Sequence, residues 1–137
     1  MAEALHLAAD IPQKALLVYD GKVLLTLDRK GLWEPPGGRI HIDEQPVDGL
    51  TRELREELGA ESEMGRVVHT FVFVSPNGAA HYVVVFACTL LTPPDQLKMD
   101  EYELRGITWV TRNEFEILPM RDGYKEALRK FFAMEKF

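Results

Sequence analysis

The sequence has little that would hold it together covalently or mark it for export. Of its 137 residues only Cys88 is a cysteine, so no disulfide can form within the chain. Cys88 lies in the apolar segment VVVFACTLL, which favours a small buried side chain over a reactive thiol. The first residues, MAEALHLAADIPQK, lack the basic start and long apolar stretch of a secretion signal. We therefore expect a cytoplasmic protein.

Long apolar runs and excess positive charge are also lacking. No apolar segment approaches the roughly 20 residues needed to cross a bilayer, so we expect no membrane partner. The formal net charge is −6, and a negative protein does not attract duplex nucleic acid through bulk electrostatics. If the ligand is a small phosphate compound, a divalent cation is the obvious bridge to it. The length suits one domain over residues 1–137, and leaves a monomer or a homodimer open.

Turn-forming residues separate the apolar segments of the first half of the chain. Asp20-Gly21, between KALLVY and KVLLTLD, is typical of a two-residue β-hairpin. The segment GLWEPPGGRI is rich in Pro and Gly and predicts a loop. A helix is expected from near Pro46 to Leu58, with Gly59 as its stop.

The second half continues with strands and ends with a helix. Strands are expected in VVHTFVFV, HYVVVFACTL and LRGITWV, and TPPDQLKMDEYE predicts a polar loop. Thr111 and Glu114 have capping-box spacing for a short helix, and Asp122 is a candidate cap for the last one. That helix carries an apolar stripe at Leu128, Phe131 and Phe132. This order predicts an α/β fold with a mixed β-sheet between helices.

The helix expected over residues 46–58 crowds three carboxylates together, at Glu53, Glu56 and Glu57. Like charges three or four residues apart on a helix cost about 0.2–0.5 kcal/mol per pair. Gly49 is expected to leave open space beside them, and oxygen donors around such a space suit Mg²⁺ or Mn²⁺. The alternative is a solvated helix face on which Arg52 and Arg55 soften the charge. An adjacent apolar stripe should pack onto the sheet: Val47, Leu50, Leu54 and Leu58.

A wider segment, GRIHIDEQPVDGLTRELREELGA, resembles the Nudix box, G-x5-E-x7-R-E-U-x-E-E-x-G-U, where U is a bulky aliphatic residue. The box spans residues 38–60, and its last position holds Ala60, which is smaller than usual. The preceding WEPPGG resembles the W-x-x-P-G-G segment common among Nudix proteins. So many fixed positions favour metal binding over a solvated face. The matching residues are Gly38, Glu44, Arg52, Glu53, Leu54, Glu56, Glu57 and Gly59.

The resemblance implies a Nudix-type α/β/α sandwich and a MutT-like hydrolase. Such an enzyme cleaves the pyrophosphate linkage of a nucleoside diphosphate joined to a group X, with Mg²⁺ or Mn²⁺ as cofactor. Arg52 would hold a box carboxylate in position through charge-assisted hydrogen bonds. The general base is expected to be Glu53, with Glu101 and Glu103 as alternatives on a later loop that also contains Asp100. By matching position, the metal site would comprise Gly38, Glu44, Glu53, Glu56 and Glu57.

The identity of X is set outside the box. The compact chain favours a nucleoside triphosphate, with ADP-ribose or a nucleotide sugar as the alternative. A domain that senses a nucleotide without hydrolysing it is the alternative of another class, although such domains often lose box acids. We expect substrate contacts from Arg39 and from three aromatic residues that can cover a base, Phe71, Phe73 and Tyr82. Each of these aromatics also suits the core or the sheet surface.

Overall fold

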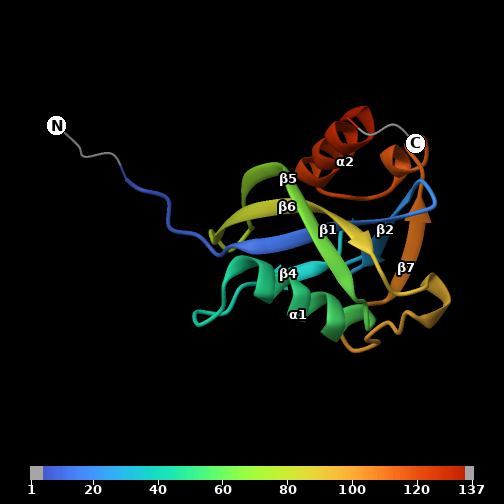
Figure 1. Ribbon diagram of the computed structural model, residues 1–137. Coiled ribbons are helices and arrows are strands. Elements are labelled where there is room, and N and C mark those ends of the chain that lie inside the picture. Colours follow the sequence, from blue (N-terminus) through green and yellow to red (C-terminus); the bar gives the residue numbers. More distant parts are fainter. Residues whose placement is uncertain (1–4, 135–137) are drawn as a thin grey trace.

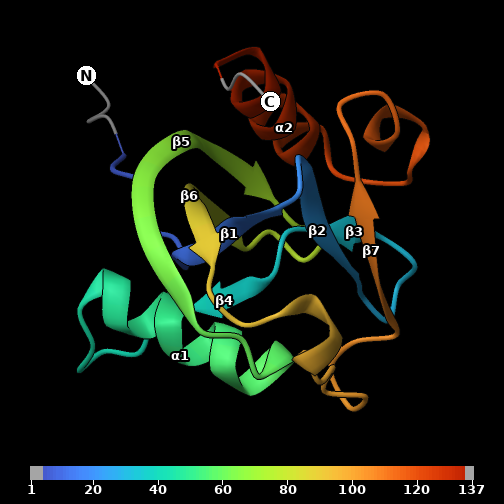
Figure 2. The same ribbon diagram turned by 45° about the vertical axis from the view of Figure 1, so that its right-hand side comes forward.

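The computed structural model describes residues 5–134, which form a mixed sheet with a helix on each face. Figures 1 and 2 show α1 and α2 on opposite sides of the sheet, which confirms the predicted layers. Single 3₁₀ turns at Pro94–Gln96 and Phe115–Ile117 complete the chain. The main elements, in chain order, are β1 (Pro12–Tyr19), β2 (Lys22–Leu27), β3 (Trp33–Glu34), β4 (Gly37–Arg39), α1 (Pro46–Leu58), β5 (Ser62–Val74), β6 (Ala80–Leu90), β7 (Gly106–Val110) and α2 (Asp122–Met134).

Strand β1 is the centre of the sheet, whose main order is β3-β2-β1-β6-β5. One edge of β1 pairs in parallel with β6 from Gln13 to Val18. The other edge pairs with β4 over its first residues and with β2 over its last two, both antiparallel. Strand β7 extends the sheet by pairing with β2. No helix among residues 5–134 is long and apolar enough to span a membrane.

The structure contains the predicted hairpin turn at Asp20-Gly21 and the predicted start and stop of helix α1. Asp20 and Gly21 both have positive φ, 51° and 71°, as a two-residue hairpin between twisted strands requires. Helix α1 begins at Pro46 and ends at Leu58, and the following Gly59, with a φ of 61°, caps it by donating its amide to the carbonyl of Arg55. These two predictions are confirmed.

Alternating residues of β1 supply the two cores. Ala15 and Leu17 face α1, whose Leu50, Leu54 and Leu58 are fully buried. Leu16 faces α2, and the predicted apolar stripe of that helix is buried against it: Leu128, Phe131 and Phe132. Cys88 is buried in the α1 core, as its apolar neighbours indicated.

Two predictions about this region are wrong. Val47 does not pack on the sheet but is 48% exposed. The sheet residue beneath the first turn of α1 is the polar Gln13, whose side-chain amide donates a hydrogen bond to the carbonyl of Pro46. The segment GLWEPPGGRI is not all loop, since it contains β3 and β4. Its glycines allow this, because a Cβ on Gly37 would lie 2.0 Å from the carbonyl oxygen of Gln13.

The C-terminal helices begin differently from the predicted starts. Glu114 accepts a hydrogen bond from the amide of Thr111, but only a 3₁₀ turn follows. Asp122 is already helical, and the carbonyl of Arg121 accepts from the amides of Tyr124 and Lys125. Arg121 is therefore the residue that precedes α2.

We expect Gly123→Ala to lower the free energy of unfolding by about 1–3 kcal/mol, as overpacking does. The new Cβ would lie 2.3 Å from the ring of Phe71, which outweighs the better helix propensity of alanine. Urea unfolding measures this change. Gly106→Ala is the control, since its Cβ would meet atoms only at 3.8 Å or beyond. Equal stability of wild type and Gly123→Ala would contradict the packing of α2 on β5.

Candidate active site

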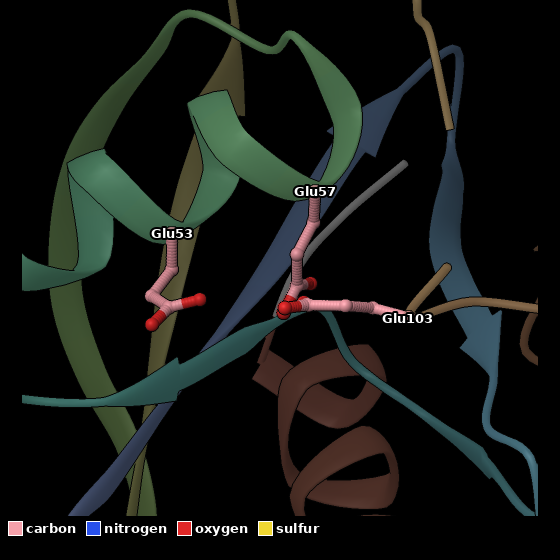
Figure 3. A group of neighbouring side chains, drawn as sticks. All are labelled: Glu53, Glu57 and Glu103. Carbon is pink, nitrogen blue, oxygen red and sulfur yellow. The ribbon is translucent and has the colours of Figure 1, made fainter. Parts of the chain in front are cut away.

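Three carboxylates from two distant parts of the chain meet at one end of α1. Glu53 and Glu57 come from the helix, and Glu103 comes from the loop before β7. One oxygen of each lies within 4.8 Å of the others, and Figure 3 shows the three side chains directed toward one another. We call these residues the acidic cluster. Hard carboxylate oxygens in this number are a donor set that suits Mg²⁺ or Mn²⁺.

The backbone of the loop holds Glu103 in place. The amide of Lys98 donates to the carbonyl of Leu58, and the amide of Asp100 donates to the carbonyl of Glu57, both at 2.8 Å. These bonds tie the loop to the last turn of α1. Of the predicted loop acids, Glu103 reaches the acidic cluster and Glu101 does not, while Asp100 accepts a hydrogen bond from the amide of Tyr102.

Glu57 is the buried member of the cluster and is only 7% exposed. Burial raises the pKa of its carboxyl to about 8, and Glu53 and Glu103 add to the rise. Lys14 and the amide of Gly37, which donates to Glu57 Oε2 at 3.3 Å, act in the opposite direction. Lys14 and the Gly37 amide together do not compensate for the burial of the Glu57 carboxylate. The residues present therefore fit a divalent cation, which would supply further positive charge.

Arg52 organises the carboxylates around the cluster. Its Nε donates to Glu44 Oε2 at 2.6 Å, and its Nη2 donates to the other oxygen of Glu44 at 2.9 Å. Its Nη1 is shared between Glu53 at 3.0 Å and Glu56 at 3.1 Å. The hydrogen bonds from Arg52 and from the amide of His41 lower the pKa of Glu44 to about 2. Glu44 thus stays charged and fixes Arg52, which in turn orients Glu53.

Glycines decide how closely these groups approach. A Cβ on Gly38 would lie 2.6–2.8 Å from the carboxyl group of Glu53, so the missing side chain makes room for that carboxylate. The prediction that Gly49 leaves open space beside the acids is wrong. A Cβ there would lie 3.1 Å from Glu44 Oε1 and 3.3 Å from Ile40. Gly49 therefore makes room for Glu44, which reaches Arg52 over the helix.

Glu56 lies outside the acidic cluster. Its side chain is 57% exposed, and its carboxylate is bound by Arg52. The same Arg52 nitrogen contacts Glu53, so the carboxylates of Glu53 and Glu56 are neighbours.

Two adjoining hollows of about 380 and 580 Å³ open beside the cluster, and together we call them the β1 hollow. Glu103 lines the first and Arg39 lines the second, while Phe73 lines both. Phe71 packs edge-on against Tyr124, with ring centroids 5.1 Å apart, and lines a neighbouring hollow that shares Phe73 and Arg121. Tyr82 does not line the β1 hollow, because it faces the other side of the sheet from its buried neighbour Val83. Of the predicted substrate contacts, the structure thus brings Arg39 and Phe73 to this hollow.

Two features of the β1 hollow escaped the sequence analysis. Lys14, only 7% exposed, donates to Glu34 at 3.2 Å. Burial alone would lower the pKa of Lys14, but Glu34, Tyr124 and Glu57 outweigh it and the pKa is raised. The second feature is Arg121, whose guanidinium carbon lies 4.0 Å from the ring centre of Phe73. A lysine at the start of the apolar strand KALLVY was the one available signal for the first feature.

Comparison with known proteins places this geometry in a family. The NUDIX domain model matches residues 13–131. The CTP pyrophosphohydrolase of Escherichia coli K12 is 46% identical over 125 residues, which cover 88% of this chain and 89% of that protein. The solution structure of the E. coli ORF135 protein superposes with a TM-score of 0.73 at 27% identity, covering 91% of each chain. The crystal structure of the MutT protein from Methanosarcina mazei Go1 has a TM-score of 0.81 at 22% identity, covering 98% of this chain and all of that one.

The matched region contains all three members of the acidic cluster, Arg52 and most of the residues that line the β1 hollow. The resemblance seen in the box thus extends from β1 to α2. The chain therefore belongs to the Nudix hydrolase family and is a hydrolase of pyrophosphate-containing substrates.

Proposed function

We propose that this enzyme hydrolyses a nucleoside triphosphate to a nucleoside monophosphate and pyrophosphate, with Mg²⁺ as cofactor and Mn²⁺ as a substitute. The observation that carries the proposal is the acidic cluster at the wall of a hollow that also holds cationic side chains. The cations suit a triphosphate, and the cluster suits the metal that accompanies it. The name of the 46% identical relative makes CTP the first substrate to test.

The proposed metal ligands are Glu53 and Glu57, with the neighbouring Glu56 as a further ligand, while Glu103 faces the same site from the loop before β7. When bound, the cation supplies charge neutralisation at the phosphate oxygens and lowers the pKa of a bound water. Glu44 would act indirectly, by binding Arg52, which in turn binds Glu53. The backbone at Gly38 would leave room for the Glu53 carboxyl group.

We propose Glu103 as the general base. Arg52 donates to the Glu53 carboxylate at 3.0 Å and holds it at the proposed metal site, so Glu53 is assigned to metal binding. Glu103 forms no ion pair with any residue of the described range 5–134. Burial, with Asp100 and Glu53 nearby, raises the pKa of Glu103. Glu101, which is exposed and outside the cluster, is the weaker candidate.

The remaining charges hold the site together. Arg52 positions Glu53 and Glu56, while Lys14 offsets part of the charge on Glu57. Retention of every box acid supports catalysis over nucleotide sensing. We also propose that residues 1–137 act as one cytoplasmic domain, as a monomer or homodimer, and that the net charge of −6 keeps it from duplex nucleic acid.

A substrate panel with Mg²⁺ tests the reaction. We expect CTP to be cleaved to CMP and pyrophosphate with kcat/KM at least about tenfold above that for ADP-ribose or nucleotide sugars. Product analysis in ¹⁸O-labelled water shows which phosphorus is attacked. Faster cleavage of ADP-ribose would select the alternative substrate class. Tight nucleotide binding without hydrolysis, with either metal, would instead indicate a sensing domain.

Glu57→Gln tests the metal site. We expect kcat to fall at least about a hundredfold, because the variant keeps the shape of the side chain but loses its charge. The metal-free variant should melt at the same or a higher temperature than wild type, since a buried carboxylate is removed. Added Mn²⁺ should stabilise wild type and not the variant. Glu56→Gln should lose less activity.

Glu61→Gln is the matched control for these two substitutions. Glu61 is paired with Arg55 on the surface, away from the cluster, so its loss should leave kcat and metal stabilisation unchanged. Full activity and full Mn²⁺ stabilisation of Glu57→Gln would exclude the proposed ligand set.

Gly38→Ala tests the role of the glycine backbone. The added Cβ would displace the carboxyl group of Glu53, which lies 2.6–2.8 Å from its position. Because the Glu53 side chain can swing outward, we expect a small change in melting temperature and a fall in kcat of at least about tenfold. Gly106→Ala, with ordinary contacts for its Cβ, should retain wild-type kcat. Undiminished turnover by Gly38→Ala would show that Glu53 needs no such room.

A further inference from the structure

We propose that Arg121 is the stacking surface for the nucleobase of the substrate, with Phe73 as the layer beneath it. This inference rests on the proposed function and assigns one residue to substrate choice. The sequence indicates Phe73 itself as a surface for the base. The structure places a guanidinium group over that ring, with its central carbon 4.0 Å from the ring centre.

The stack below Arg121 is continuous. Phe73 on β5 lies opposite His81 on β6, and their rings stack at 4.6 Å with planes inclined by 17°. The guanidinium group of Arg121, from the start of α2, lies over the same Phe73 ring. A guanidinium group supported by an aromatic ring offers a planar outer face to solvent, and nucleobases stack on arginine planes as they do on aromatic rings.

The backbone of Arg121 is fixed while its side chain is free to receive a ligand. Its carbonyl caps α2 through the amides of Tyr124 and Lys125. Two residues earlier, the carbonyl of Pro119 accepts a hydrogen bond at 2.8 Å from the amide of Trp33 on β3. No Asp or Glu within the described residues 5–134 forms an ion pair with Arg121. The Arg121 side chain thus extends from a fixed backbone over the Phe73 ring, and it faces the β1 hollow without an acidic partner.

Arg121 also lies in the hollow next to the acidic cluster. It lines both parts of the β1 hollow, and Glu103 of the acidic cluster lines the first part with it. A triphosphate held at the cluster therefore extends its nucleoside along the hollow toward Arg121. The combined space falls in the range of small-ligand sites.

Arg121→Lys tests the inference, because lysine keeps the charge and loses the plane. We expect KM for CTP to rise about tenfold while kcat stays within threefold of wild type. Ribose 5-triphosphate, which has no base, should inhibit CTP hydrolysis by wild type and variant with the same Ki. Arg121→Ala should show the same pattern as Arg121→Lys. Arg129→Lys, which changes a paired arginine on the exposed face of α2, is the control and should behave as wild type.

Three results would overturn the assignment. An unchanged KM for CTP means that the base does not stack on Arg121. An equal rise in KM for CTP and in Ki for ribose 5-triphosphate means that Arg121 contacts the triphosphate through its charge. A fall in kcat alone means that it acts in the chemical step. If wild type cleaves no nucleoside triphosphate, the proposed function fails first, and the assignment fails with it.

Discussion

The close approach of α1 to the backbone of β4 is the constraint on which the site depends. Gly37 pairs with Lys14 on β1 at a φ of 141° and donates its amide to Glu57. Gly38 leaves the room that the carboxyl group of Glu53 fills. Side chains at these two positions would push helix and strand apart. Two carboxylates from consecutive turns of α1 could then no longer lie against the sheet edge.

Charge balance among the carboxylates is the second constraint, and two positively charged side chains, Arg52 and Lys14, contribute to it. Arg52 binds Glu44, Glu53 and Glu56 on the solvent side of the helix. Lys14 approaches from β1, where its charge favours the ionised form of Glu57. Lys14 does not outweigh burial, which raises the pKa of Glu57 to about 8, with Glu53 and Glu103 adding to the rise. A cation bound among the three carboxylates would favour the ionised form of Glu57, so the cluster suits a cation site better than a closed ion-pair network.

The sequence predicts local features better than contacts between distant segments. The bounds of α1 and the hairpin at Asp20-Gly21 follow from turn and cap chemistry, which acts over a few residues. The strand pairing of Gly37–Arg39 does not, because it depends on β1 and contradicts the local preference of glycine. In the same way, the spacing of the box indicates Glu53 and Glu57. Selecting Glu103 among three loop acids requires the hydrogen bonds between that loop and the end of α1.

The buried leucines of α1 hold its glutamates close together despite their mutual repulsion. Leu50, Leu54 and Leu58 are fully buried, and Glu53 and Glu57 each precede one of them by a single residue. Burial of each leucine contributes about 1.5–3 kcal/mol, whereas a like-charge pair on a helix costs only about 0.2–0.5 kcal/mol. The leucines therefore determine the rotation of the helix, and the glutamates must point toward β4. Repulsion within the cluster cannot be relieved by turning α1, so it is relieved by protonation of Glu57, whose pKa is raised to about 8, or by the binding of a cation.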